Sequence, residues 1–370
     1  MDNNNGTPKK FNWRTLNWTR IAIILIIVGV VLFVVGWFSG GRGVGISFAN
    51  NRFNLYTSAT EHGFPDSFTP IERGGAIRNI YINTTSIPVT VRTTPAGERD
   101  GIYLRNVNPD SVTVTREGIN INTRRTERVI WVFGFHFGYA NREIIVNLPA
   151  YTSADTLNIR SSSGRVEVHG LSADEAIIRS TSGRITVYEL SANLIGINST
   201  SGSLHLNDLQ GYSIRAGSTS GSITINRANV TTFLSARSTS GSIRGENLEM
   251  RDGHMQSTSG SIRIDRIIWH DLSARSTSGS VQISDGQILG MTASGTEMPI
   301  PGSTTLNSTS GRVNLYLLEN RENFSYSINT TSGGINVDGF SQGRGRTTGG
   351  NGDHEISIRS TSGGVRLQFR

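Results

Sequence analysis

The chain has 370 residues, of which 35% are hydrophobic and 17% are charged, and it contains 43 glycines and no cysteine. The lack of cysteine excludes disulfides, thiolate metal sites, iron–sulfur clusters and cysteine nucleophiles. The net charge is +7. The chain has two lysines, Lys9 and Lys10, and beyond residue 10 it contains arginine but no lysine. Schiff-base chemistry and phosphate-loop binding, which need lysine, are therefore excluded from the rest of the chain.

Residues 21–38, IAIILIIVGVVLFVVGWF, form an uncharged apolar stretch that predicts one transmembrane helix. This length is enough to cross the roughly 30 Å hydrocarbon layer of a bilayer. Lys and Arg are concentrated in residues 1–20, which favours a cytoplasmic N-terminal segment and an extracytoplasmic C-terminal part. The alternative is a cleaved signal peptide, but that would have a shorter apolar core and a small-residue cleavage site. The sequence thus predicts a single-pass protein of the cell membrane.

Residues 39–75 have no regular pattern and are interpreted as a linker. From residue 76 onward, apolar and polar residues alternate with period two, which indicates β-strands. We expect degenerate coils or a cap in residues 76–150 and regular coils in residues 151–370.

The regular part repeats the sequence Ser-Thr-Ser-Gly at intervals of 19 or 20 residues over its first seven copies. A fixed period near 20 residues is typical of a solenoid. The glycines of the repeat are Gly164, Gly183, Gly202, Gly221, Gly241, Gly260, Gly279, Gly311, Gly333 and Gly363. The predicted fold is all-β, a right-handed β-solenoid or β-helix of ~19-residue coils, preceded by the transmembrane helix.

Within a coil, two short strands are expected to meet at the Ser-Gly corner. Alternation points Ile262 and Ile264 inward after one such corner, and the first serine of the motif also faces inward. We expect the glycine to supply a backbone angle that larger residues avoid, and the inward serines to hydrogen-bond at the corner. About fifteen coils would give a rod of ~70 Å.

These features resemble the bacterial family of candidate adhesins defined by the DUF4097 domain. The resemblance rests on the Ile80-x-Ile82 strand, a strand that ends in Leu148-Pro149, and the recurrent I-x-S-x-S-G-x-I-x-I, and it covers residues 76–370. It implies a β-solenoid at the cell envelope, often behind one membrane span, with no catalytic residues. Family members often carry Asp or Asn after the corner glycine, whereas this chain has Arg, Ser or Gly there, so an acidic ladder that could bind cations is absent. No cofactor or metal is expected.

Four residues before each corner glycine is an outward position that holds an arginine in half of the coils. A guanidinium group suits bidentate contacts to phosphate and carboxylate. This row is a candidate site for an extended anionic polymer, such as a teichoic acid or an acidic polysaccharide, or for anionic lipid headgroups. The alternative is that these charges serve only solubility and edge protection. The residues concerned are Arg160, Arg179, Arg237, Arg275 and Arg359.

A second candidate is an aromatic patch in the stretch VIWVFGFHFGY at residues 129–139. Alternation places four of its aromatic side chains on one face, where they would either bind a glycan, lipid or partner or cover the open end of the core. The four are Trp131, Phe133, Phe135 and Phe137.

The chain stops in the alternating strand Val365–Arg370 with no cap after it, which suggests an open edge and end-to-end self-association. Enzyme motifs such as H-E-x-x-H are absent, and acidic residues are dispersed. The function expected is therefore a non-enzymatic envelope adhesin or scaffold. An envelope-stress sensor that binds a lipid, peptide or membrane partner is the alternative, and a glycan-acting enzyme is a third. Nucleic acid is not expected, because the predicted span places the domain outside the cell.

Overall fold

The computed structural model describes residues 26, 29, 44–49, 52–57, 64–71, 77–115, 117–123, 142–150, 152–289 and 302–370. The chain forms two compact units, which are residues 1–63 with 128–138, and residues 64–127 with 139–370. In the first unit, β1 (Val44–Ala49) and β2 (Arg52–Thr57) form an antiparallel pair, so the segment interpreted as a linker contains strands.

The predicted transmembrane stretch lies almost wholly outside the described residues. Among the residues that are described, no helix is both long enough and apolar enough to cross a membrane.

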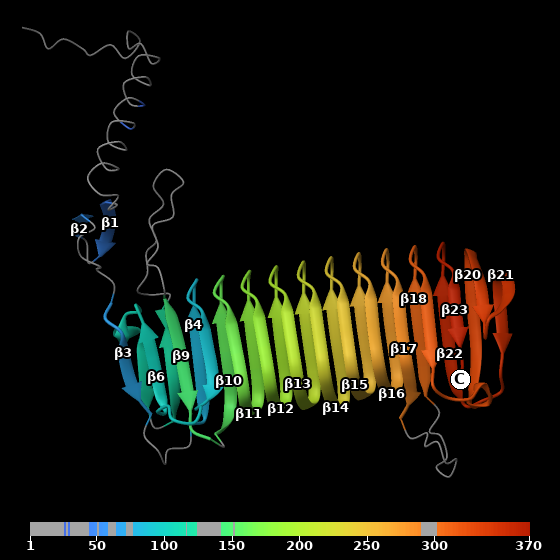
Figure 1. The fold of residues 1–370 in the computed structure, drawn as a ribbon, viewed down its shortest axis with the longest axis horizontal. Helices are drawn as coiled ribbons and strands as arrows, with labels where there is room; N and C mark the ends of the chain where they lie inside the picture. The colour runs from blue at the N-terminus through green and yellow to red at the C-terminus, as the bar shows by residue number, and fades with distance from the viewer. Residues whose placement is uncertain are drawn as a thin grey trace, which may run out of the picture. The chain divides into compact units, whose positions relative to one another are not determined.

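The second unit is a single 21-stranded sheet wound into a β-solenoid, which confirms the all-β prediction (Figure 1). Its regular elements are β3 (Ser67–Pro70), β4 (Asn79–Thr84), β5 (Val89–Thr93), β6 (Gly101–Arg105), η2 (Pro109–Ser111), β7 (Val112–Thr115), β8 (Gly118–Asn122), β9 (Glu143–Leu148), β10 (Ser153–Ser161), β11 (Val166–Ser180), β12 (Ile185–Ser199), β13 (Leu204–Ser218), β14 (Ile223–Ser238), β15 (Ile243–Ser257), β16 (Ile262–Ser276), β17 (Val281–Ile288), β18 (Ser303–Ser308), β19 (Val313–Leu317), η4 (Arg321–Asn323), β20 (Phe324–Val337), β21 (Phe340–Gly349), β22 (His354–Ser360) and β23 (Val365–Gln368).

The central coils stack in parallel, so that each residue lies beside its counterpart in the next repeat. Ile185 of β12 pairs with Leu204 of β13, for example, and Ser199 pairs with Ser218. The interval from Gly221 to Gly241 has 20 residues instead of 19. Strand β14 accommodates the extra residue as a bulge after Val230, where its register with both β13 and β15 shifts. Inward aliphatic side chains from successive coils form one continuous buried core.

Most buried serines of the repeat hydrogen-bond to the backbone of the corner, as predicted, whereas the Ser180 hydroxyl has no such partner among the described residues. The Ser257 hydroxyl oxygen accepts the N–H of Gly260 at 2.9 Å and donates to the carbonyl of Gly241 in the preceding coil at 3.1 Å. The side chain therefore satisfies polar groups of two coils inside a dry core, which offsets the cost of burying it.

The reason for the corner glycines differs from the prediction. Gly183 does not have a positive φ, but a Cβ placed on it would lie 2.0 Å from the carbonyl oxygen of Gly164 in the preceding coil. Gly241 meets Gly221 in the same way. The repeat thus needs glycine for close stacking of corners rather than for an unusual backbone angle.

A second corner, not predicted, lies six residues after each of the first seven corner glycines, Gly164 to Gly279. There a residue with positive φ bends the long strand, and in most coils it is not glycine. Polar and charged residues, of which Asn and Asp adopt this conformation most readily, hold the position. They are Glu189, Asp208, Arg227, Asn247, Arg266 and Asp285, with Gly170 at the start of the row.

The described part of the solenoid contains twelve stacked levels, fewer than the fifteen expected, and spans roughly 50 Å. One row of core residues in register marks the levels: Ile144, Val89, Val166, Ile185, Leu204, Ile223, Ile243, Ile262, Val281, Val313, Val365 and Ile335. The number is smaller because β3, β6, β7 and β21 run antiparallel to their neighbours and cover the ends instead of adding levels.

At both ends, the order of levels departs from the order of the sequence. The level of β4 and β5 lies between β8–β9 and β10–β11, and the level of β22 and β23 lies between β18–β19 and β20 (Figure 1). Strand β23 is therefore paired on both sides, so the expectation that it forms an open edge is wrong. The strand at this end is β21, whose Gly343 and Gly345 have positive φ.

Candidate ligand-binding surfaces

The registers place the five predicted arginines in one outward row along the solenoid. Arg160 pairs directly with Arg179, and the row continues through Asn198 and Gly217 to Arg237. From there it passes through Gln256, Arg275 and Asn307 to Arg359. All five arginines are exposed.

The first part of this row lines a groove of about 530 Å³, which we call the arginine groove. Arg160, Arg179 and Arg237 contribute cationic side chains, and the Asn198 amide lies over Gly217 in the stretch between Arg179 and Arg237. Hydroxyl groups of the adjacent Ser-Thr corners complete the lining. Arg275 and Arg359 continue the row beyond the groove.

The charges of this row are not neutralised within the described part of the chain. None of its five arginines forms an ion pair or side-chain hydrogen bond with another described residue, unlike Arg227 and Arg266 elsewhere on the surface. Their field reaches a neighbouring group, because burial lowers the pKa of His254, and the positive charges of Arg237 and Arg275 lower it further. The row is thus available to an anionic ligand.

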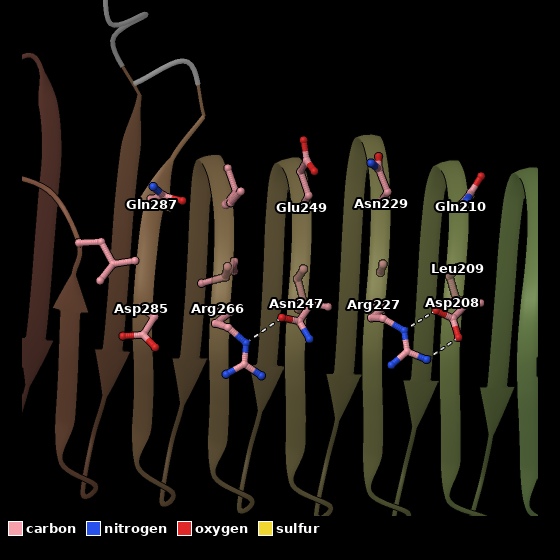
Figure 2. Close-up of a pocket in the computed structure, with 15 residues that line it drawn as sticks. Asp208, Leu209, Gln210, Arg227, Asn229, Asn247, Glu249, Arg266, Asp285 and Gln287 are labelled. Carbon is pink, nitrogen blue, oxygen red and sulfur yellow. Dashed lines mark hydrogen bonds and ion pairs between the residues drawn. The ribbon is translucent and has the colours of Figure 1, made fainter. Parts of the chain in front are cut away.

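A second groove, of about 490 Å³, runs over the second corner and was not predicted (Figure 2). One rim consists of the residues with positive φ, where Arg227 donates to Asp208 (Nη2 to Oδ2, 2.6 Å) and Arg266 donates to Asn247 (2.7 Å). The hydrogen bond from Arg227 lowers the pKa of Asp208. Buried aliphatic residues such as Leu248 form the floor. Both arginines of this groove have carboxylate partners, and Glu249 and Asp285 add negative charge to its lining, so it lacks the unpaired positive charges of the arginine groove.

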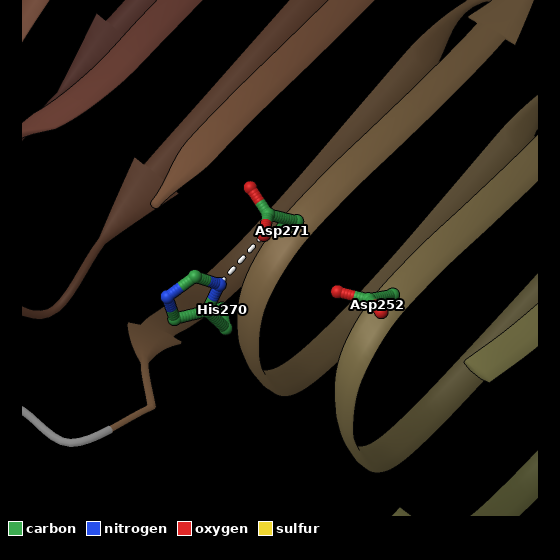
Figure 3. Close-up of side chains that lie close together, drawn as sticks. All are labelled: Asp252, His270 and Asp271. Carbon is green, nitrogen blue, oxygen red and sulfur yellow. Dashed lines mark hydrogen bonds and ion pairs between the residues drawn. The ribbon is translucent and has the colours of Figure 1, made fainter. Parts of the chain in front are cut away.

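A third arrangement joins Asp252, His270 and Asp271, whose ligand-type atoms lie within 4.8 Å of one another (Figure 3). His270 Nδ1 lies 2.6 Å from Asp271 Oδ2, and Asp271 Oδ1 accepts hydrogen bonds from the amide and hydroxyl of Ser303. Burial raises the pKa of Asp271, but the hydrogen bonds from Ser303 and His270 outweigh it and leave the pKa lowered. Both carboxylate oxygens of Asp271 already have partners, and through Ser303 this side chain connects β16 to β18.

Two titratable groups outside the two grooves, the half-buried Glu319 and the buried His354, have strongly shifted pKa values. Burial raises the pKa of Glu319 to about 7, against the opposing hydrogen bond that its Oε1 accepts from the amide of Ile288. Burial also lowers the pKa of His354 to about 4. The His354 ring contacts the Thr304 hydroxyl (2.8 Å), which accepts from Trp269 Nε1 (2.9 Å), so this histidine belongs to a buried hydrogen-bonded chain.

The predicted aromatic patch, Trp131, Phe133, Phe135 and Phe137, lies outside the described residues. The second groove was missed because alternation hides a bend inside a long strand. A charged or Asn residue recurring six positions after the corner glycine, as at Asp208 and Arg227, was the signal that could have located it.

Residues 77–245 and 213–368 match a family model described as Toastrack DUF4097. Among solved structures, the solenoid is similar to a candidate cell adhesion protein from Clostridium sporogenes. The two chains share 9% identity with a TM-score of 0.21, and the alignment covers 82% of this chain and 99% of the other. No curated protein matches the sequence.

Proposed function

We propose that this chain, which belongs to the Toastrack DUF4097 family, is a non-enzymatic envelope protein whose arginine row binds an extended anionic polymer. The observation that carries the proposal is the alignment of Arg160, Arg179 and Arg237 in one groove without an ion pair among the described residues. Arginine offers the planar, bidentate donors that phosphate and carboxylate groups require.

The spacing of the row suits an extended ligand rather than a compact one. Arg237, Arg275 and Arg359 follow one another two levels apart, which corresponds to about 10 Å between successive charges. A single small anion could contact only one or two of these side chains. A polymer that carries an anionic group at every repeat could contact several at once, and its affinity would rise through multivalency.

We also propose that residues 21–38 anchor the protein in the cell membrane, with residues 1–20 in the cytoplasm and the solenoid outside. The uncharged apolar stretch and the basic residues before it support this topology. Expression with a reporter fused to the C-terminus would test it, because an extracytoplasmic solenoid predicts activity only from a reporter that functions outside the cytoplasm.

The polymer proposal is tested by the binding of full-length protein, in mild detergent, to immobilised teichoic acid and to polygalacturonate across a salt series. These probes carry phosphodiester and carboxylate groups, respectively. Replacing Arg160, Arg179, Arg237, Arg275 and Arg359 with Gln should abolish binding to at least one of them. Binding by the unchanged protein should weaken as salt rises.

A matched control removes the same charge from other exposed positions, by replacing Arg165, Arg184, Arg244, Arg251 and Arg263 with Gln. The control should retain most of the affinity if the row itself forms the site. Equal losses in both variants would mean that binding depends only on net charge. Absence of binding to either probe at low salt would overturn the proposal.

A further inference from the structure

Of two glycines near the C-terminal end of the solenoid, Gly334 has no steric reason to be glycine and Gly364 has only a weak one. Gly334 and Gly364 each follow a corner glycine, and neither has a positive φ. A Cβ on Gly334 would meet only the carbonyl oxygen of Gly343, at 4.0 Å, and one on Gly364 would lie 3.3 Å from the Gly334 carbonyl. By contrast, a Cβ on the corner residue Gly363 would lie 2.0 Å from the carbonyl of Gly311.

The missing side chains leave a hollow of about 290 Å³ on the opposite side of the corner from the arginine row. Elsewhere in the regular coils, the position after the corner glycine carries Arg or Ser, which would fill this space. The hollow is walled by two guanidinium groups, two amides and a hydroxyl, with no carboxylate in its lining. These groups belong to Arg312, Arg366, Asn314, Asn336 and Ser341.

The two arginines remain available to a ligand. Arg366 Nη1 lies 3.4 Å from the hydroxyl of Tyr316, a neutral partner that orients the side chain without cancelling its charge. Arg312 has no ion pair with any described residue. The nearby carboxylate of Asp338 is already engaged, because it accepts the amide of Phe369 at 2.9 Å and lies 3.7 Å from Arg321.

We propose that this hollow, which we call the Gly-Gly pocket, binds a single phosphate monoester group. Such a group carries a charge of about −1.5 to −2 at neutral pH, which matches two guanidinium groups better than a monocarboxylate does. Its oxygens can accept from both arginines and from the Asn314 and Asn336 amides. The pocket is separate from the arginine row, so it can be correct or wrong independently of the polymer proposal.

The test measures binding of inorganic phosphate, glycerol 3-phosphate and acetate to the full-length protein by calorimetric titration at low salt. Both phosphates should bind, and acetate should bind at least about ten-fold more weakly. Tighter binding of glycerol 3-phosphate would assign an esterified ligand, and equal affinities would assign free phosphate. No phosphate binding at millimolar concentration would overturn the proposal.

Two variants test whether phosphate binds in the Gly-Gly pocket. Replacing both Arg312 and Arg366 with Gln should weaken phosphate binding at least about ten-fold, and Gly334→Val should do the same by filling the hollow. Gly196→Val is the matched control, because a Cβ on Gly196 also meets nothing within 4 Å but lies outside the pocket. Equal effects of the two valine variants would contradict the assignment, as would unchanged binding by the double arginine variant.

Discussion

The hydroxyl of Ser276 donates a hydrogen bond to the carbonyl of Gly260 in the preceding coil at 3.0 Å. The same oxygen accepts the amide N–H of Gly279 at 2.9 Å. One buried side chain thus closes its own corner and connects that corner to the next. The same pair of hydrogen bonds recurs at Ser257 and Ser308. We call this row of buried serines the serine ladder, and we expect each of its members to stabilise the stacking of two coils.

Ser276→Ala should destabilise the solenoid by about 1–3 kcal/mol, because the buried amide of Gly279 loses its partner. The denaturation midpoint in urea would measure this. Ser278→Ala removes an exposed hydroxyl from the same corner and should change stability by less than about 0.5 kcal/mol. Similar midpoints for the two variants would show that the ladder contributes little.

Gly241→Ala should be strongly destabilising, by about 2 kcal/mol or more, because its Cβ would lie 2.0 Å from the Gly221 carbonyl oxygen and force the coils apart. Gly196→Ala has open space and should be neutral or slightly stabilising, since glycine is unfavourable within a strand. Thermal unfolding of both variants measures the contrast. A tolerated Gly241→Ala would contradict the close-stacking explanation of the repeat.

Amide hydrogen exchange should be slow in β23, although that strand lies close to the C-terminus. Its residues pair with β19 on one side and β20 on the other, so its amides should exchange at rates comparable with those of β14. Strand β21 pairs only with β20 among the described strands and should exchange much faster. Rapid exchange throughout β23 would mean that this strand is not inserted between β19 and β20.

Stability should carry a contribution from Glu319 that falls as pH rises. The carboxyl has a pKa of about 7 in the folded chain, against about 4.3 when unfolded. Between these values the folded chain keeps a proton that the unfolded chain has lost, so the free energy of unfolding decreases with pH across this window.

Glu319→Gln mimics the protonated side chain and retains an oxygen to accept from Ile288. It should therefore raise the thermal midpoint relative to the unchanged protein at pH 8 and have little effect near pH 4. Thermal melts of both proteins across this range measure the difference. A constant difference at all pH values would show that Glu319 does not titrate between them.

The repeat was predictable because it depends on a short local pattern. Alternation identified inward residues such as Ile262, and the recurring corner identified both the solenoid and the family, which the match to residues 77–245 and 213–368 confirms. The hydrogen bonds of the inward serines followed from the cost of burying a hydroxyl. The order of the arginine row from Arg160 to Arg275 also followed from the nearly constant period, because parallel stacking in register brings equivalent positions together.

What the sequence did not reveal depends on contacts between coils and on chain order at the ends. The role of Gly183 could not be read from its conformation, because the clash that excludes a side chain involves the preceding coil. The insertion of β23 between β19 and β20 is a choice between pairings of similar strands, all of which alternate aliphatic with polar residues where they pair. Periodicity cannot distinguish such pairings.

The exchanged order of levels has a consequence for how the solenoid assembles as the polypeptide is made. Strands β11 to β16 can stack one after another as they emerge, because each neighbour in space is also the next in sequence. Strand β20, however, emerges before the residues that separate it from β19. It must therefore wait for β22 and β23, or pair wrongly with the existing stack and later release it. On either route β20 reaches its final place only after β22 and β23 have been made, so folding at this end cannot proceed in the order of synthesis.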